Sequence, residues 1–268
     1  MKVGFIQFNP IFGDVQSNTN KTVKLINQGK IADLLVLPEL CNTGYLFEDK
    51  SELEKLAERI PEGKTTKAWI KAAQDTNTYL VAGICEKNEE GTFFNSSVLI
   101  GPEGFIDIYR KIHLFNSEKN FFQPGKGPLK IYDIGLAKIG MMVCFDWAFP
   151  EIARILALNG AEIICHPSNL VLTYAQKAML TRSIENKVFT ITANRIGEDI
   201  RPNSKIAFTG NSQITSPNME ILAQAGAATE EVLIAEIDPA IAQNKMITPN
   251  NHIFLDRKTD LYYPLLNK

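Results

Sequence analysis

Two kinds of hydrophobic pattern alternate along the chain. Short apolar runs rich in β-branched residues predict strands, and segments with apolar residues at i, i+3 and i+4 predict helices. Strands are predicted at Val3–Phe8, Leu34–Leu37, Tyr79–Glu86, Asn95–Ile100, Leu136–Phe145, Glu162–His166, Val188–Ala193, Gly210–Ser216 and Val232–Ile237. Helices are predicted at Asn18–Lys30, Ser51–Glu58, Thr65–Asn77, Pro150–Leu158, Tyr174–Lys187 and Pro239–Lys245.

The order of these elements favours an α/β protein with more than one sheet. Several predicted strands follow one another without a helix between them, which a simple doubly wound sheet would not produce. We therefore expect two mixed sheets that pack together, with helices outside. No linker or low-complexity tract divides the chain, so residues 1–268 are predicted to form a single domain.

Composition and charge narrow the function classes. Lys plus Arg total 28 and Asp plus Glu total 30, giving a net charge of −2, and no basic run indicates a nucleic-acid partner. No stretch approaches the roughly 20 apolar residues of a membrane span, and the N-terminus lacks the pattern of a signal peptide. We expect a cytoplasmic protein with reduced cysteines and no membrane association.

The segment around Cys144 carries the strongest chemical signal. Cys144 follows an apolar predicted strand, and Pro150 suits the first turn of the next helix. Ligands in α/β proteins commonly bind where a strand ends before a helix, and the positive helix end favours a thiolate. The alternative reading is strong, because a lone cysteine in an apolar strand is usually part of the core.

The other cysteines are weaker candidates for a nucleophile. Cys165 and His166 are adjacent on a predicted strand, so their side chains point to opposite faces and cannot act as a pair. Cys85 lies in an ordinary strand pattern, and Cys41 lies in a polar loop where it could be exposed. None of the four cysteines forms a C-x-x-C pair, and with only three histidines a structural zinc site is not expected.

Two further ionisable residues lie next to apolar segments. Glu39 comes directly after the run Val36–Pro38, where partial burial would raise the pKa of its carboxyl and suit it to act as a base. Lys111 precedes an apolar and aromatic stretch, and an alternating pattern would place it on one face with Tyr109 and His113. Taken alone, each residue is more simply read as a surface charge.

Together these segments resemble the nitrilase superfamily of carbon–nitrogen hydrolases. The matching motifs include LPEL around Glu39, RKIHLF around Lys111 and CFDWAFPE from Cys144 onward, and they occur in the family's order. VGFIQFNP, SEKNFFQPG, AEIICHPSN and FTGNSQITSPN also match, so the resemblance covers nearly the whole chain. It implies a four-layer α-β-β-α sandwich and a homodimer or higher homo-oligomer.

The resemblance also implies roles for particular residues. Cys144 would be the nucleophile, Glu39 the general base, and Lys111 with the Phe145 backbone N–H the oxyanion partners. Glu118 matches a second glutamate of the family, which would orient the lysine or the substrate. These residues would hydrolyse a small-molecule amide or nitrile through a thioester or thioimidate, without a metal or organic cofactor.

Candidate substrate contacts lie near the catalytic candidates in the sequence. They are Tyr45, Phe115, Phe145, Trp147, Phe149 and Asn169. Relatives that process ω-amides often carry an arginine where this chain has Ala148, and that arginine can bind a substrate carboxylate. Ala148 beside Trp147 therefore indicates a neutral aliphatic substrate, with amide and nitrile both open.

Other functions are compatible with the same fold. A non-catalytic or thiol-sensing binding protein would keep the architecture, and an acyl-transferring relative would use another nucleophile in place of water. A papain-like protease is disfavoured, because His113, His166 and His252 all lie outside the contexts known for such enzymes.

Overall fold

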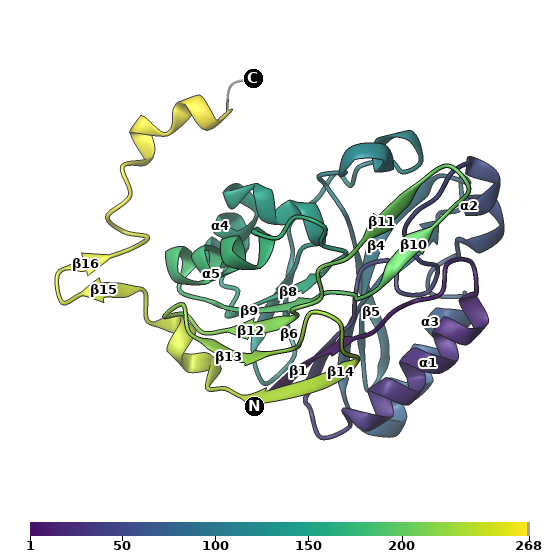
Figure 1. The fold of residues 1–268 in the computed structure, drawn as a ribbon. Coiled ribbons are helices and arrows are strands. Elements are labelled where there is room, and N and C mark those ends of the chain that lie inside the picture. Colours follow the sequence, from purple (N-terminus) through teal and green to yellow (C-terminus); the bar gives the residue numbers. More distant parts are fainter. Residues whose placement is uncertain (267–268) are drawn as a thin grey trace.

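The computed structural model describes residues 1–266 and consists of two six-stranded sheets with helices on their outer faces (Figure 1). The first sheet has, in spatial order, β14 (Glu231–Glu236), β1 (Lys2–Gln7), β2 (Leu34–Val36), β3 (Tyr79–Lys87), β4 (Phe93–Gly101) and β5 (Gly104–Arg110). The second has β13 (Ile221–Gln224), β12 (Gln213–Thr215), β9 (Phe189–Ala193), β8 (Ile163–Pro167), β7 (Lys138–Met141) and β6 (Ile131–Asp133).

Both sheets are mixed and share one plan. In each, three central strands are parallel (β1, β2 and β3; β7, β8 and β9), and antiparallel strands extend the sheet on both sides. Two short hairpins lie outside the sheets: β10 (Glu198–Ile200) with β11 (Lys205–Ala207), and β15 (Met246–Thr248) with β16 (Asn251–His252).

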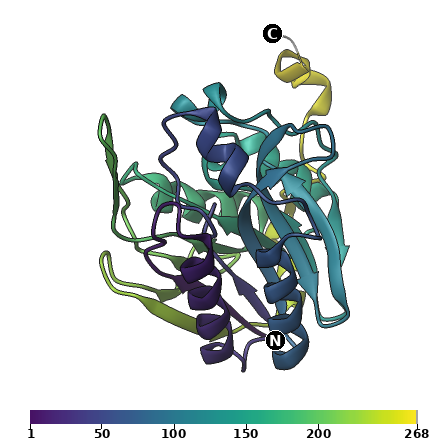
Figure 2. The same cartoon turned by 90° about the vertical axis from the view of Figure 1, so that its right-hand side faces the viewer.

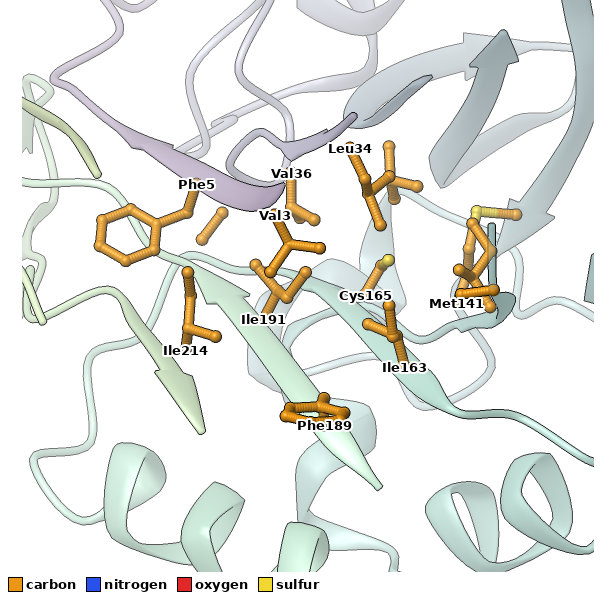
Figure 3. Packing of buried hydrophobic residues seen from close by; sticks show 14 of the residues in the cluster. Val3, Phe5, Leu34, Val36, Met141, Ile163, Cys165, Phe189, Ile191 and Ile214 are labelled. Carbon is orange, nitrogen blue, oxygen red and sulfur yellow. The ribbon is translucent and has the colours of Figure 1, made fainter. Parts of the chain in front are cut away.

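The two sheets face each other across an apolar core. Figure 3 shows Val3, Phe5 and Val36 of the first sheet pointing toward Ile191 and Ile214 of the second. These side chains are fully buried. Burial of this much apolar surface supplies the main force that holds the sheets together.

Helices cover the outer face of each sheet and complete the four layers. The helices are α1 (Val15–Gln28), α2 (Lys50–Leu56), α3 (Lys64–Thr76), α4 (Pro150–Leu158) and α5 (Ala175–Asn186). Figure 2 shows α1 and α3 side by side, and their apolar faces cover the first sheet, as α4 and α5 cover the second. The predicted α-β-β-α sandwich is confirmed.

The predicted helix at Pro239–Lys245 is wrong in type. This segment is a short 3-10 helix, Pro239–Gln243, because the backbone becomes extended at Asn244 before β15 begins at Met246. The Pro150–Leu158 helix is confirmed with its predicted bounds. Within residues 1–266, none of the helices combines the length and apolar character needed to cross a bilayer.

The predicted strand Leu136–Phe145 is too long. Strand β7 ends at Met141, and Cys144–Ala148 forms a separate 3-10 helix. The chain leaves the sheet because Cys144 adopts a left-handed backbone conformation with φ of 42°, which no continuing strand can accommodate. This turn places the cysteine beyond the strand end and defines the site described next.

Candidate active site

Four ionisable side chains from separate segments meet beyond the strand ends between the two sheets. Glu39 follows β2, Lys111 follows β5, Glu118 lies in a 3-10 helix at Asn116–Asn120, and Cys144 begins the 3-10 helix after β7. Glu39 and Lys111 are fully buried, and Glu118 and Cys144 are nearly so. The alternative reading of Glu39 and Lys111 as surface charges is therefore wrong.

The lysine joins the two glutamates. Lys111 Nζ donates to Glu39 Oε1 at 2.7 Å and to Glu118 Oε1 at 2.8 Å. Burial disfavours the Lys111 ammonium, but the adjacent carboxylates of Glu118 and Glu39 outweigh it and hold the lysine pKa above its ordinary value. Lys111 is thus a fixed positive charge in a dry environment, which is a property that an oxyanion partner requires.

Glu118 has a further partner in Tyr45. The Tyr45 hydroxyl donates to Glu118 Oε1 at 2.6 Å, and the backbone N–H of Phe115 donates to Glu118 Oε2 at 3.2 Å. Burial raises the pKa of Glu118, Lys111 opposes the rise, and Glu39 adds to it. Tyr45, predicted as a substrate contact, therefore has its hydroxyl bound to a glutamate.

Cys144 is a neutral thiol at rest. Burial and the Glu39 carboxylate raise its pKa well above the ordinary value, whereas Lys111 and a hydrogen bond from the Asn169 backbone only partly oppose the rise. The expectation that a helix end would favour a thiolate is wrong, because α4 begins at Pro150 and desolvation dominates. A base must therefore remove the proton when the sulfur attacks.

The backbone around these residues departs from common conformations. Cys144, Leu40 and Asn116 all have positive φ, between 42° and 45°. Leu40 directly follows Glu39, and Asn116 lies two residues before Glu118. Such conformations cost free energy and concentrate at functional sites, where the surrounding structure holds them in place.

A small cavity lies beside the cysteine. Its lining residues are Phe115, Cys144, Phe145, Trp147, Asn169, Leu170, Val171 and Leu172. The cavity volume is about 10 Å³, which corresponds to roughly the space for one water molecule. Its walls are apolar apart from Cys144 and Asn169. Both polar atoms of the Asn169 carboxamide are buried and lack a partner among the described residues.

Four of the predicted substrate contacts line this cavity, namely Phe115, Phe145, Trp147 and Asn169. Phe149 lies elsewhere, with its ring stacked on His113 at a centroid distance of 3.5 Å. Phe145 also borders a larger cavity of about 380 Å³ that Phe149 and His113 help to line.

Asp146 connects the cysteine turn to the lysine segment. Its Oδ2 accepts from the Tyr109 hydroxyl at 2.7 Å and from the Val143 N–H at 2.9 Å. Its Oδ1 lies 2.8 Å from His113 Nδ1. Tyr109 and His113, predicted to share a face, both contact Asp146, whereas Arg110 between them turns to Glu86.

The remaining cysteines lie in the interior. Cys41, Cys85 and Cys165 are fully buried and unpaired, so the expectation that Cys41 could be exposed is wrong. Cys41 is buried because the loop after β2 is bound to β3, where the Cys41 N–H donates to Gly83 O at 3.2 Å. The predicted opposite orientation of Cys165 and His166 is confirmed. Cys165 faces the core between the sheets, and His166 Nε2 lies 2.9 Å from the Cys144 carbonyl.

Sequence reasoning missed Asn95, Asp146 and the role of His166. Asn95 Nδ2 donates to Glu39 Oε1 at 2.6 Å. A polar run, Asn95–Ser97, inside a strand of otherwise apolar residues was the available signal for Asn95, because buried polar groups need a specific partner. The available signal for Asp146 was its place within the matched CFDWAFPE segment.

The fold and the site define an α-β-β-α sandwich with a buried cysteine, lysine and two glutamates at one end. The chain belongs to the carbon-nitrogen hydrolase family, whose model matches residues 2–245, and so to the nitrilase superfamily. It is 47% identical to a nitrilase of Pyrococcus abyssi, over 98% of this chain and 99% of the relative.

Two further relatives broaden the comparison. An (R)-stereoselective amidase from a Pseudomonas species is 31% identical over 84% of this chain and 81% of its own length. The crystal structure of a carbon-nitrogen hydrolase from Helicobacter pylori G27 has a TM-score of 0.91 and 28% identity, with 100% of this chain and 99% of that chain covered. The chain is thus similar to both amidases and nitrilases.

Proposed function

We propose that this carbon–nitrogen hydrolase cleaves a small, neutral aliphatic amide or nitrile through a covalent intermediate on Cys144. The observation that carries the proposal is the buried Lys111 ammonium, which binds Glu39 and Glu118 beside a neutral thiol. Such a cluster is costly to bury, and nucleophilic catalysis gives each of its members a task.

In the proposed reaction Cys144 Sγ attacks the substrate carbon as its proton passes to Glu39. An amide forms a tetrahedral oxyanion, which Lys111 and the Phe145 N–H stabilise. The Phe145 N–H precedes the first hydrogen bond of its 3-10 helix, which runs from Asp146 N–H to Val143 O. The protonated Glu39 then gives its proton to the departing nitrogen, so that ammonia leaves and a thioester remains.

Water completes the cycle. Glu39 takes a proton from water as the water oxygen attacks the thioester carbon. When the tetrahedral intermediate collapses, the C–S bond breaks, Glu39 returns the proton to the Cys144 sulfur and the acid is released. A nitrile adds the thiol across its triple bond to give a thioimidate, and two waters are then consumed in forming acid and ammonia. All of these steps use side chains and backbone groups of this chain.

The cavity supports the proposed substrate class. Its mostly apolar walls favour an uncharged substrate group beside Cys144, and the relatives include both a nitrilase and an amidase. The raised pKa of Cys144 disfavours thiol sensing, because sensor cysteines react as thiolates at neutral pH. Four unpaired cysteines support a reducing compartment, such as the cytoplasm.

The first prediction tests this reaction with a panel of aliphatic amides and nitriles. We expect at least one of them to yield ammonia and acid in equal amounts, and Cys144→Ala and Glu39→Gln to lower this turnover by at least about 1,000-fold. Cys165→Ala, which removes a buried thiol from the core between the sheets, is the matched control and should keep its activity. Turnover that survives Cys144→Ala would contradict the mechanism, and hydroxamate formed with added hydroxylamine would reveal acyl transfer.

A further inference from the structure

Asn95 occupies an unusual place for an asparagine. It lies in strand β4, its side chain is fully buried, and it pairs with Cys85 of β3. Asparagine is disfavoured in strands, and a buried carboxamide costs free energy unless it is hydrogen-bonded. Its Oδ1 is buried without a partner among the described residues. Asn95 therefore lowers the free energy of unfolding relative to an apolar residue at the same position.

Asn95 forms hydrogen bonds with both members of the buried Glu39–Lys111 ion pair. Its side-chain Nδ2 donates to Glu39 Oε1 at 2.6 Å, and its backbone oxygen accepts from the Lys111 N–H at 2.8 Å. Lys111 Nζ also donates to Glu39 Oε1, at 2.7 Å. One carboxylate oxygen of Glu39 thus receives two donors, which fix the orientation of the carboxylate.

The other carboxylate oxygen is left without a partner. Glu39 Oε2 is buried and accepts no hydrogen bond from the described residues. An oxygen without donors is the better proton acceptor, because each donated hydrogen bond stabilises negative charge on the oxygen that receives it. The two oxygens of Glu39 are therefore chemically different, and Asn95 contributes to the difference.

We propose that Asn95 is a positioning residue for Glu39, holding Oε1 so that Oε2 receives the proton of the Cys144 thiol. The inference rests on the proposed function, in which Glu39 is the base. In this step the S–H bond breaks, its proton forms a bond to Oε2, and the sulfur electron pair forms the bond to the substrate carbon. Asn95 itself touches no reacting atom.

The pH dependence follows from the charges around Glu39. The titratable groups that face it are Tyr45, Lys111, Glu118, Cys144 and Arg195. Loss of the Asn95 donor leaves these groups in place and removes one hydrogen bond to the ionised carboxylate. The acidic limb of the rate profile is therefore expected to move to higher pH when this donor is lost.

The test compares Asn95→Leu and Asn95→Asp with the control Ser97→Ala. Ser97 lies two residues along on the same face of β4, and its hydroxyl faces Met141 Sδ at 3.9 Å. We expect Asn95→Leu to lower kcat by about 10- to 100-fold with KM changed by less than about threefold, and to move the acidic limb of kcat/KM to higher pH. Asn95→Asp should move it further, because a second carboxylate repels the charge on Glu39.

A second readout separates this inference from the proposed function. The alkylation rate of Cys144 by iodoacetamide, followed by mass spectrometry across pH, requires no turnover. If the panel yields no ammonia, the proposed function fails, yet an upward shift of the alkylation profile in both Asn95 variants still supports the positioning role. The positioning role is overturned if the acidic limb stays in place in both the rate profile and the alkylation profile of the Asn95 variants. This holds even if the variants are less stable to unfolding.

Discussion

At the scale of single residues, the site depends on close contacts that leave no room for adjustment. Glu39 lies directly over Gly83 of β3, where an added Cβ would be 2.3 Å from the Glu39 Cα. The Gly83 N–H donates to Pro38 O at 3.1 Å, and Gly83 O accepts from the Cys41 N–H at 3.2 Å. Gly83 thus binds the loop that carries Glu39 and sets its height above the sheet.

We therefore predict that Gly83→Ala disables the enzyme. The new methyl group would meet backbone atoms of Pro38, Glu39 and Leu40, none of which can rotate away. A displacement of about 1 Å can cost 100-fold in rate, so kcat/KM should fall by at least that factor. Gly29→Ala is the control, because its methyl group would meet only the side chains of Leu35 and Val232, which belong to the cluster between the first sheet and its helices. Similar losses in kcat/KM for both variants would contradict this account.

Residue patterns in the sequence identified the candidate groups but not their environment. Glu39 and Lys111 read as surface charges because charged side chains are mostly exposed, and only the resemblance suggested that they meet. Asn95 was missed because its partner Glu39 lies 56 positions away, in a loop whose path depends on β3. Contacts of this kind depend on how the strands pair, which local sequence does not encode.

At the scale of elements, β8 supports the turn that carries the cysteine. His166 on β8 is fully buried, with Nε2 2.9 Å from the Cys144 carbonyl and Nδ1 3.1 Å from Thr192 Oγ1. A neutral ring with the proton on Nε2 satisfies both contacts, because a carbonyl accepts and a hydroxyl can donate. Burial lowers the pKa of His166 to about 4, although Asp146 opposes the change.

This low pKa predicts acid destabilisation. Between about pH 6.5 and pH 4 the unfolded chain binds a proton at His166 that the folded protein does not, so the free energy of unfolding falls as pH falls. The loss due to His166 reaches about 3 kcal/mol at pH 4. Denaturant unfolding from pH 7 to pH 4 should show a steeper decline for the parent protein than for His166→Gln. Equal slopes would contradict a neutral buried His166.

Periodic elements were predictable, and the functional turn was not. The α4 helix has a run of apolar positions at helical spacing, a proline in its first turn and Asn159-Gly160 at its end, so its bounds followed from sequence. The Cys144–Ala148 turn is too short to show a period, and its positive φ is held by tertiary contacts of Asp146 and His166. The strand was predicted to continue beyond the true end of β7 because Met141, Met142 and Val143 are all apolar.

At the scale of the whole molecule, residues up to about 245 form the sandwich, and the family match ends at the same point. Beyond it the chain extends away from the body through β15 and β16 (Figure 1). Phe254 holds the start of this segment, with its ring 5.2 Å from both Arg154 and Lys245. The following segment, residues 255–266, exposes large apolar side chains: Leu255, Leu261, Tyr262, Tyr263, Leu265 and Leu266.

We propose that residues 255–266 pack against a second copy of the chain in a homodimer. Leu261 and Leu265 are 66% and 67% exposed, and clustered apolar side chains at this exposure indicate an interface. The double variant Leu261→Asp with Leu265→Asp should then weaken the dimer by at least about 100-fold in Kd, measured by sedimentation equilibrium. The control, Ile11→Asp with Ile31→Asp, changes residues of the body that are 58% and 62% exposed and should leave Kd unchanged. A monomeric parent protein, or equal effects of the two double variants, would contradict the proposed role of this segment.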